Sequence, residues 1–584
     1  MPDKYLVLSK NKYLYPKNSV KLYLNLSCFH GELSNKIISE DFYIKNFVKP
    51  NIFYTDIEGD KKVEETEKLF NSLSNSLFAF LNNFHGTNYS KRYWEIIYGN
   101  WLKVFINTIS ERYYNIKFAL EKYQFDKIII SNEKFININN TLSDFDDNTG
   151  DDKWNFDLYS SIIREIFKDK EKLIFKTLKK NQMKKWEAKY SLKDKLVLSI
   201  KRVINLFGIF FPKKNNSLIS DVNLNFFSLL KLNYFLKQFP TFYFRKKINF
   251  ISYNETLRNN YNFDHDKYVG IEKFIRKILP TCLPTTIIEN YKNIKNITQK
   301  LDWPTNPEFI YTGTEFRENE LFKFWTAEKT DKNFLYFVVQ HGNNYATLKD
   351  CHLMNEVKTC DKFISWGKSG GNKYVPLFNT LNLNYKKKIK NKNKIYFFMR
   401  HYPFKKILSW DDEYEVFKSY YQTNISIKFL KDDIRKKIII RINMNYLKGK
   451  KDFFLNFFEN KENLKIDFLR HHKNQAFNNS QLIVHCYDST AFLETMSLGI
   501  PSVSLLSNEH KFLKAEARGV YSDLLKNKII FTDPKLMAQH INQVISGNIY
   551  EWWDRKDVVR TRQLFLEKYS IPVKNNPEKY LAET

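Results

Sequence analysis

The residue types with the clearest chemical arrangement lie in the stretch QLIVHCYDSTAFLETMSLGIPSVSLL, residues 481–506. Its apolar run Leu482–Cys486 is long enough for a buried strand and too short for a helix. Tyr487–Thr490 supplies polar residues that suit a turn and a helix N-cap, and Gly499 ends the short helix that follows. A second apolar run completes a strand–helix–strand unit, so the turn is predicted at the carboxyl end of a parallel strand.

This turn has the residue types of a nucleotide site. Backbone N–H groups at a helix start attract anions, and Ser489 and Thr490, which follow Asp488, add two hydroxyl donors for phosphate. Glu494 lies one helical turn further along the same face, where its carboxylate can accept hydrogen bonds from ribose hydroxyls. An ordinary capped helix in an α/β core has the same pattern, and this stretch alone leaves both interpretations open.

A second candidate loop, QHGNNY at residues 340–345, follows the predicted buried strand Phe334–Val339. Open α/β sheets place their sites at such strand ends. His341 is the candidate general base, because an imidazole suits removal of a hydroxyl proton near neutral pH. A histidine held only by structural contacts is the alternative. In a reaction that retains stereochemistry no base is needed, and His341 would orient phosphate or acceptor instead.

Two arginines also follow predicted strands. Arg400 ends the strand over 395–399, and Arg441 ends the strand over 437–441, just before Asn443. Both guanidinium groups can neutralise the phosphate of a leaving nucleotide without a metal ion. The acidic loop at 144–152 fails the spacing of a calcium-binding EF-hand, so we expect no metal site.

These motifs resemble the nucleotide-binding signature of GT-B glycosyltransferases, and more closely the family of O-antigen and surface-carbohydrate transferases. The likeness covers nearly the whole chain, through HGTNYSKRYWEIIYGNWL (85–102), DDKWN (151–155), QHGNNY (340–345), DKFISWG (361–367) and the tail over 508–569. The resemblance implies acceptor-site roles for His85 and Arg92, with Gln340 and Asn343 as further candidates. Many related enzymes place His-Pro where this chain has Asn443-Met444, so the nucleotide base stays open.

The expected fold is α/β and GT-B-like, with two Rossmann-like domains facing a cleft and a helical elaboration of the N-terminal half. We assign residues 1–388 to an acceptor-side α/β domain with helical insertions at about 60–215, and residues 389–548 to a nucleotide-binding Rossmann-like domain. Residues 549–584 form a helix that crosses back to the first domain. Strands are also expected over 217–221, 250–253 and 309–313.

Composition restricts the class of protein. The chain has 584 residues, 43% hydrophobic, and 94 Lys and Arg against 64 Asp and Glu give a formal net charge of +30. A basic nucleic-acid-binding protein is therefore the rival class, but no zinc-ligand spacing or RNA-binding aromatic signature supports it. Five scattered cysteines without CxxC spacing indicate a reducing compartment, and the expected localisation is cytoplasmic.

A basic stretch at 161–214 ends in an amphipathic segment, residues 196–212. Leu196, Ile200, Val203 and Phe207 share one predicted helix face flanked by Lys and Arg, a pattern that suits a helix lying on an anionic membrane surface. A packing helix between domains fits equally well. Either way the protein is expected to be cytoplasmic, with peripheral attachment to the inner face of the membrane in the first case.

The function predicted from these features is a metal-independent glycosyltransferase of lipopolysaccharide or other surface-polysaccharide biosynthesis. It moves a sugar from a nucleotide-sugar to a glycan or lipid-linked glycan acceptor, and needs no cofactor besides that donor. The alternatives are transfer of a polyol-phosphate group from a CDP-linked donor, or nucleic-acid binding. Donor sugar, acceptor and stereochemical outcome stay open.

Overall fold

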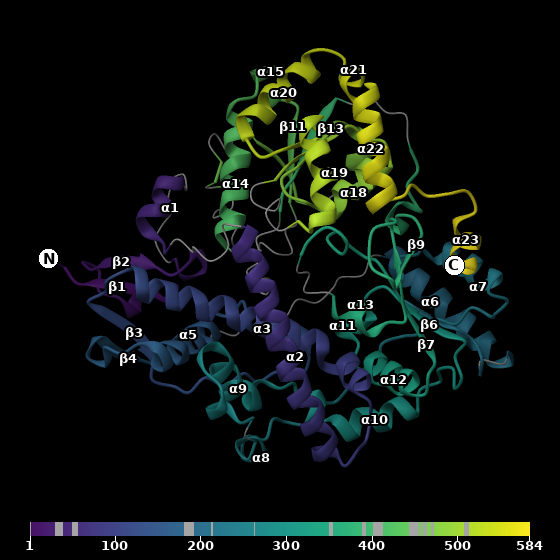
Figure 1. Ribbon diagram of the computed structural model, residues 1–584. Coiled ribbons are helices and arrows are strands. Elements are labelled where there is room, and N and C mark those ends of the chain that lie inside the picture. The colour runs from purple at the N-terminus through teal and green to yellow at the C-terminus, as the bar shows by residue number, and fades with distance from the viewer. Residues whose placement is uncertain are drawn as a thin grey trace.

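The computed structural model describes residues 2–29, 39–48, 56–179, 192–211, 214–261, 263–349, 354–387, 393–400, 413–442, 455, 457–458, 464–468, 472–506 and 513–584. Within these residues three parallel β-sheets are covered by helices (Figure 1). The predicted α/β fold with two Rossmann-like units is confirmed in the second and third sheets, and the first sheet is an addition.

The third sheet has the strand order of a Rossmann fold. Its order is β12-β11-β10-β13-β14-β15, so the direction of strand addition reverses between β10 and β13. These strands are β10 (Lys394–Phe398), β11 (Ile438–Arg441), β12 (Lys465–Asp467), β13 (Ser480–His485), β14 (Ser502–Leu505) and β15 (Ile530–Phe531). Ligands of such sheets bind outside the carboxyl ends at this reversal, which here is bordered by Arg400 and Tyr487.

Helices cover both faces of this sheet. α14 (Glu413–Lys428) packs with α20 (Pro534–Ser546), and α18 (Thr490–Ser497) and α19 (Ala515–Lys526) pack with α22 (Lys556–Tyr569) on the opposite side (Figure 1). The central strands are therefore apolar on both faces, which explains why they read as continuous apolar runs in the sequence.

The second sheet adds its strands in chain order, β5-β6-β7-β8-β9. They are β5 (Leu218–Ser220), β6 (Phe309–Thr312), β7 (Leu335–Val339), β8 (Lys362–Ser365) and β9 (Tyr374–Pro376). α11 (Glu315–Glu318) and α12 (Glu320–Asp331) connect β6 to β7. The carboxyl end of β7 opens into the 340–345 loop, as expected from the sequence.

The first sheet was not predicted as a separate unit. Its order is β2-β1-β3-β4, from β1 (Lys4–Val7), β2 (Val20–Tyr23), β3 (Lys127–Ser131) and β4 (Leu173–Lys176). β1 and β2 lie near the N-terminus, but their partner β3 follows two long helices, α2 (Asp56–His85) and α3 (Lys91–Lys122). Local sequence carries no signal for that pairing across the helices.

α3 lies at the centre of the N-terminal half. It packs against α2, α5 (Asp152–Ile166), α12 and α13 (Asn355–Thr359), and so joins the first sheet to the second (Figure 1). α2 ends at His85 and α3 begins at Lys91. Most residues of α3 from Tyr93 to Ile116 are buried, including charged ones such as Arg112.

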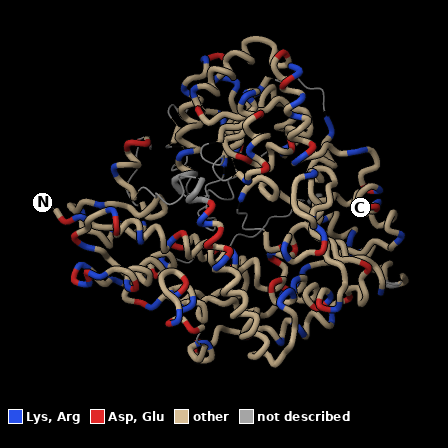
Figure 2. Tube along the Cα trace, viewed as in Figure 1, with Lys and Arg blue, Asp and Glu red and all other residues tan. Residues whose placement is uncertain are grey.

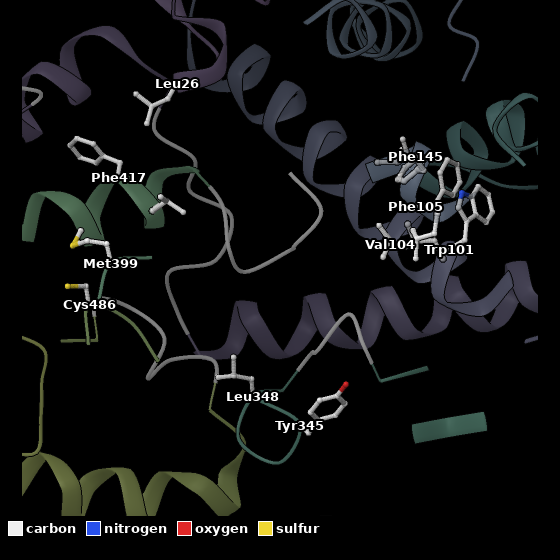
Figure 3. Close-up of a cluster of buried hydrophobic side chains, with 14 of the residues drawn as sticks. Leu26, Trp101, Val104, Phe105, Phe145, Tyr345, Leu348, Met399, Phe417 and Cys486 are labelled. Carbon is white, nitrogen blue, oxygen red and sulfur yellow. The ribbon is translucent and has the colours of Figure 1, made fainter. Parts of the chain in front are cut away.

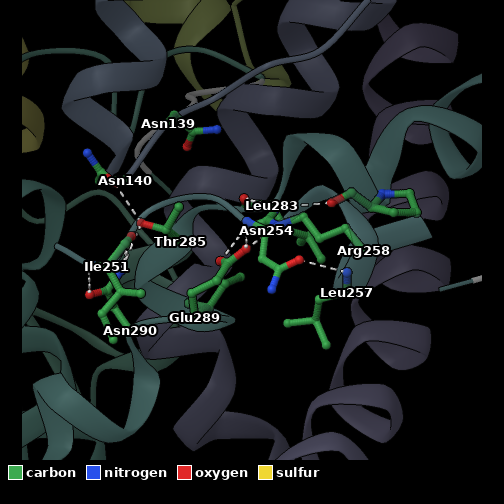
Figure 4. Close-up of polar contacts among 12 residues, drawn as sticks. Asn139, Asn140, Ile251, Asn254, Leu257, Arg258, Leu283, Thr285, Glu289 and Asn290 are labelled. Carbon is green, nitrogen blue, oxygen red and sulfur yellow. Dashed lines mark hydrogen bonds and ion pairs between the residues drawn. The ribbon is translucent and has the colours of Figure 1, made fainter. Parts of the chain in front are cut away.

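The strand expected over 250–253 is absent from the structure, which has no regular secondary structure there. The side chain of Asn290 takes the place of a partner strand: the Ile251 N–H donates to Asn290 Oδ1 at 2.6 Å, and Asn290 Nδ2 donates to the Ile251 carbonyl at 3.1 Å (Figure 4). One side-chain amide thus satisfies the backbone hydrogen-bonding groups of Ile251. The apolar residues of this segment had suggested a strand.

The C-terminal segment contacts the second sheet. After α22 the Ile571 N–H donates to the Trp366 carbonyl at 2.7 Å, and α23 (Pro577–Glu583) packs on α7 (Phe226–Phe235). The backbone approaches so closely that a Cβ at Gly367 would collide with the Lys568 carbonyl. The single helix predicted over residues 549–584 is divided into α21 (Ile549–Trp553), α22 and α23.

One buried apolar cluster includes residues of all three sheets. Figure 3 shows part of it, from Met399 and Cys486 of the third sheet through Leu348 to Trp101 and Phe105 of α3. Figure 2 shows Lys and Arg spread over every part of the described chain, rather than gathered in one stripe. Among the residues that the structure describes, no helix has the length and apolar character needed to cross a bilayer.

Candidate functional site

The carboxyl ends of the second and third sheets meet through two loops that the sequence singled out. The Asn343 N–H donates to Thr490 Oγ1 at 3.1 Å, and Asn343 Nδ2 donates to Asp488 Oδ1 at 2.8 Å. The other carboxylate oxygen of Asp488 accepts from the Tyr521 hydroxyl at 2.8 Å. The structure therefore brings Asn343 together with Asp488 and Thr490, which lie 145 and 147 residues further along the chain.

Further contacts hold the 340–345 loop in this place. Lys514 Nζ donates to the Tyr345 carbonyl at 3.0 Å, and the Lys514 N–H donates to the Thr347 carbonyl at 2.8 Å. Gln340 spans the loop, because its Oε1 accepts from the Trp366 N–H and its Nε2 donates to the Gly342 carbonyl, both at 2.8 Å. Gln340 therefore holds the backbone of this loop, and its contact with an acceptor stays a prediction.

His341 lies at the head of a chain of hydrogen bonds. Its Nδ1 is 3.1 Å from the Tyr345 hydroxyl, which donates to Glu356 Oε1 at 2.6 Å. With the hydroxyl proton of Tyr345 directed to Glu356 Oε1, the tyrosine oxygen accepts from His341 in the tautomer that carries the ring proton on Nδ1. This assigns the lone pair of the imidazole to Nε2, which has no hydrogen-bond partner among the described residues.

Burial, with help from the nearby Arg317 guanidinium, lowers the pKa of His341 to about 4. The imidazole is therefore neutral at physiological pH and its Nε2 is a free acceptor. Burial raises the pKa of Glu356 to about 8, an effect that the Tyr345 hydrogen bond partly offsets. A neutral histidine oriented by a buried tyrosine and carboxyl group has the geometry of a general base with a supporting acid behind it.

Ser489 has a different role from the predicted one. Its Oγ accepts from the Phe492 N–H at 3.1 Å and lies 3.1 Å from His485 Nδ1. Thr495 Oγ1 donates to the Phe492 carbonyl and so accepts from His485 Nε2 at 3.0 Å. Burial lowers the pKa of His485 to about 3, so the ring is neutral and its Nδ1 accepts the Ser489 proton.

Both hydrogen-bonding functions of the Ser489 hydroxyl are therefore occupied inside the protein. The side chain is 2% exposed and serves as the N-cap of α18. We revise its predicted contact with phosphate accordingly. Thr490 is partly exposed and its Oγ1 accepts from Asn343, which leaves its proton to donate. The signal for this difference was His485, a buried strand histidine four residues before Ser489.

Glu494 is buried and forms an ion pair with Lys473. Burial raises the pKa of its carboxyl group, and the lysine opposes this shift. Arg441 is likewise buried in an ion pair with Asp467, and its guanidinium lies 5.6 Å from the centre of the Phe398 ring. Each of these two predicted ligands therefore has a partner of opposite charge inside the protein, and their roles toward a nucleotide stay predictions.

Arg400 stands at the reversal point of the third sheet. It is 4% exposed, and its guanidinium lies 5.8 Å from the centre of the Tyr487 ring. Asn443, the remaining predicted nucleotide ligand, lies outside the described residues.

The structure does not bring His85 or Arg92 into this group. His85 stacks on Tyr291 at 4.0 Å between ring centroids, and its Nε2 is 2.9 Å from the Ile287 carbonyl. Arg92 donates to the Thr359 carbonyl at 2.9 Å and pairs with Asp361 at 2.8 Å. Both residues hold helices against neighbouring loops, and their acceptor-site roles stay predictions.

Sequence reasoning missed Glu356, Tyr521 and Lys514, although Tyr345 lay within a motif that it named. Glu356 belongs to a short helix with no motif, and only its full burial distinguishes it. In the part of the chain described, no three His, Cys, Asp or Glu side chains are grouped so that they could hold a metal ion. Metal independence itself remains a prediction.

The fold and this site define an α/β protein with a Rossmann sheet whose reversal point faces a histidine-bearing loop. Residues 4–584 match the family model described as "LIC12162 family transferase", and the chain belongs to this family. It is therefore a transferase. No curated protein matches the chain.

Solved structures give distant likenesses. MurG from Acinetobacter baumannii is 10% identical, with 51% of this chain and 77% of that chain covered and a TM-score of 0.29. The wall teichoic acid polymerase TagF is 12% identical, with 67% and 94% covered and a TM-score of 0.29. A UDP-GlcNAc 2-epimerase from Neisseria meningitidis, bound to UDP-GlcNAc, is 12% identical, with 48% and 80% covered and a TM-score of 0.28. The proposals below rest on the family and on the contacts of the site.

Proposed function

We propose that this transferase moves a sugar from a nucleotide-sugar to a hydroxyl group of a glycan acceptor, with His341 as the general base. The observation that carries the proposal is the hydrogen-bond chain from Glu356 through Tyr345 to His341, at a loop that touches the α18 N-terminus through Asn343 and Thr490. A base and an anion-attracting helix start are thus adjacent, as group transfer from a nucleotide requires.

In this mechanism His341 Nε2 removes the proton of the acceptor hydroxyl while its oxygen attacks the anomeric carbon. The bond from that carbon to the nucleotide phosphate breaks, and the phosphate leaves with the bonding electrons. Tyr345 keeps the imidazole in the tautomer with a proton on Nδ1, so Nε2 is ready to accept. The α18 N–H groups, Thr490 and Arg400 stabilise the charge that grows on the phosphate.

Three finer statements belong to the same proposal. The acceptor is a surface-polysaccharide precursor of O-antigen or capsule type, either a glycan or a lipid-linked glycan. The enzyme works in the cytoplasm, on the inner face of the membrane. No cofactor is required beyond the donor. The family's transferase description supports the reaction class alone, and the exposed apolar side chains of residues 196–210 support the membrane location.

A thermal-shift screen tests the donor class. The ligands are CMP, UDP and GDP, their sugar conjugates, and a CDP-linked polyol for the alternative polyol-phosphate reaction. A ligand at a hundredfold excess over its Kd stabilises the native state by about 2.7 kcal/mol, so a preferred nucleotide gives a clear rise in Tm. A generic oligonucleotide serves as control. Stabilisation by the oligonucleotide alone, with no response to any nucleotide, contradicts the proposal.

Thr490→Val and Ser489→Ala are expected to separate phosphate binding from helix capping. Thr490→Val removes the partly exposed hydroxyl, so nucleotide affinity falls by about 1–1.5 kcal/mol, close to tenfold. Ser489→Ala removes the cap and the donor to His485 Nδ1, so it lowers the free energy of unfolding by about 1 kcal/mol or more and leaves the nucleotide Kd unchanged. Calorimetric titration and urea unfolding measure the two effects.

The matching nucleoside provides the control for this pair, because its binding should not respond to Thr490→Val. Equal weakening of nucleotide binding by both variants would return Ser489 to the phosphate site.

Transferase activity is expected to survive EDTA. The phosphate is held by N–H groups, a hydroxyl and an arginine, so no cation is needed to neutralise it. The rate of donor turnover with and without EDTA measures this. Loss of activity that Mg²⁺ or Mn²⁺ restores is the contrary result.

A further inference from the structure

The apolar face of α6 (Leu192–Phe207) points away from the protein. Leu196, Ile200, Val203 and Phe207, which share one side of the helix, are all exposed. The opposite side holds the helix in place: Asn205 Nδ2 donates to the Phe242 carbonyl at 2.7 Å, and the Phe242 N–H donates to Asn205 Oδ1 at 2.9 Å. A surface helix of a globular protein normally has the reverse orientation, with its apolar stripe against the core.

A second helix extends this surface. α7 exposes Phe227 at 71% and Tyr234 at 77%, and Phe210, which follows α6, is 82% exposed. The rings of Phe211 and Phe239 stack at 4.3 Å between centroids and tie the end of α6 to the end of α7, which lies beside it in Figure 1. The α6–α7 face consists of Leu196, Ile200, Val203, Leu206, Phe207, Phe210, Phe227 and Tyr234.

The segment that carries this face is rich in positive charge. Residues 195–254 contain ten Lys and Arg and a single acidic residue, Asp221. Several of the cations are exposed, among them Lys195, Arg202, Lys231 and Lys237. Lys231 lies on α7 between Phe227 and Tyr234, so apolar and cationic side chains share the same surface. Such a combination matches the acyl chains and the anionic headgroups of a lipid layer.

We infer that the α6–α7 face binds an anionic phospholipid bilayer, with its apolar side chains in the interface and its Lys and Arg among the headgroups. A second copy of the chain is a poor occupant, because a symmetric contact would bring two surfaces of the same charge together. Membrane binding would hold the enzyme beside a lipid-linked acceptor, and this role rests on the proposed function.

Co-sedimentation with vesicles tests this inference. The full chain is mixed with vesicles of phosphatidylcholine alone, or of phosphatidylcholine with phosphatidylglycerol. The wild type is expected to sediment with the anionic vesicles and to dissociate as salt is raised. Phe207→Ser with Phe210→Ser should lower the fraction bound by about tenfold, since both rings leave the interface. Arg202→Gln with Lys231→Gln should weaken binding to anionic vesicles only.

The matched control is Leu525→Ser with Leu536→Ser, which removes two side chains of 44% and 57% exposure from α19 and α20. It should bind vesicles like the wild type. Unchanged vesicle binding by the Phe207 and Phe210 variant overturns the inference. A wild-type dimer that dissociates in this variant also overturns it, because the face would then bind a second copy of the chain. Nucleotide-induced Tm shifts of the same variants should match the wild type, so failure of membrane binding and failure of the proposed function are distinguishable.

Discussion

His341→Ala is expected to lower kcat by about 10²-fold or more while leaving the Kd of the donor nucleotide nearly unchanged. The reason is geometric: Nε2 is the only nitrogen of this ring left to accept a proton, since Nδ1 donates to Tyr345. The donor is proposed to bind the third sheet, so its affinity does not depend on this imidazole. Steady-state rates and calorimetric titration of the nucleotide measure the two quantities.

Two supporting variants sharpen this prediction. Tyr345→Phe removes the oxygen that receives Nδ1–H, and it should lower kcat by about tenfold without changing donor affinity, because the tautomer is no longer imposed.

The pKa of His341 of about 4 gives the pH dependence: the neutral base is present above this value, so kcat falls as pH decreases through it. His265→Ala, a change on a histidine that pairs with Asp266, is the control and should leave kcat unchanged.

A His341→Ala enzyme with normal kcat would show that the ring only orients the loop. Normal chemistry together with weaker acceptor binding is the result expected of a retaining enzyme, in which no base acts on the acceptor hydroxyl.

Glu289→Ala is expected to lower the free energy of unfolding by about 3–5 kcal/mol. Glu289 accepts from Arg258 Nε at 2.7 Å and from its Nη2 at 2.6 Å, and Arg258 is fully buried (Figure 4). Arg258 also donates to the carbonyls of Pro280 and Leu283 at 2.9 and 2.6 Å. Removal of the carboxylate leaves a buried guanidinium without its counter-ion, and urea unfolding measures the loss.

Glu328→Ala is the matched control for this variant. Glu328 pairs with Lys332 at 3.1 Å, but the lysine side chain is 59% exposed, so the expected change is under about 1 kcal/mol. Arg258→Met with Glu289→Leu keeps volume and removes both charges, and it should recover most of the stability that Glu289→Ala loses. Equal effects of Glu289→Ala and Glu328→Ala would show that burial adds nothing to the Arg258 pair.

The strands of the second and third sheets could be predicted because buried parallel strands are apolar on both faces. Residues 335–339 and 480–485 carry that signal within a few positions, and the loops that follow them are where α/β sheets place ligands. His341 and Thr490 were identified in this way. The turn at 488–490 was recognised from its N-cap residues, which act locally and therefore leave a local trace.

The first sheet and the apparent strand at 250–253 needed the tertiary structure. β1 pairs with β3 across two long helices, and Asn290 satisfies the Ile251 backbone from 39 residues away. Both outcomes depend on which groups meet in space, so apolar pattern and residue propensity do not contain them.

By itself the sequence determined the α/β class, the two Rossmann-like units and the two loops that carry the candidate site, because each of these is set by short-range pattern. Only the tertiary structure decided what the side chains do. It placed Glu356 behind Tyr345 and His341, and it turned the apolar face of α6 outward. It also placed the Ser489 hydroxyl where it donates to His485 Nδ1 and accepts from the Phe492 N–H. A hydroxyl has only one proton, so this buried acceptor uses the donor function of Ser489.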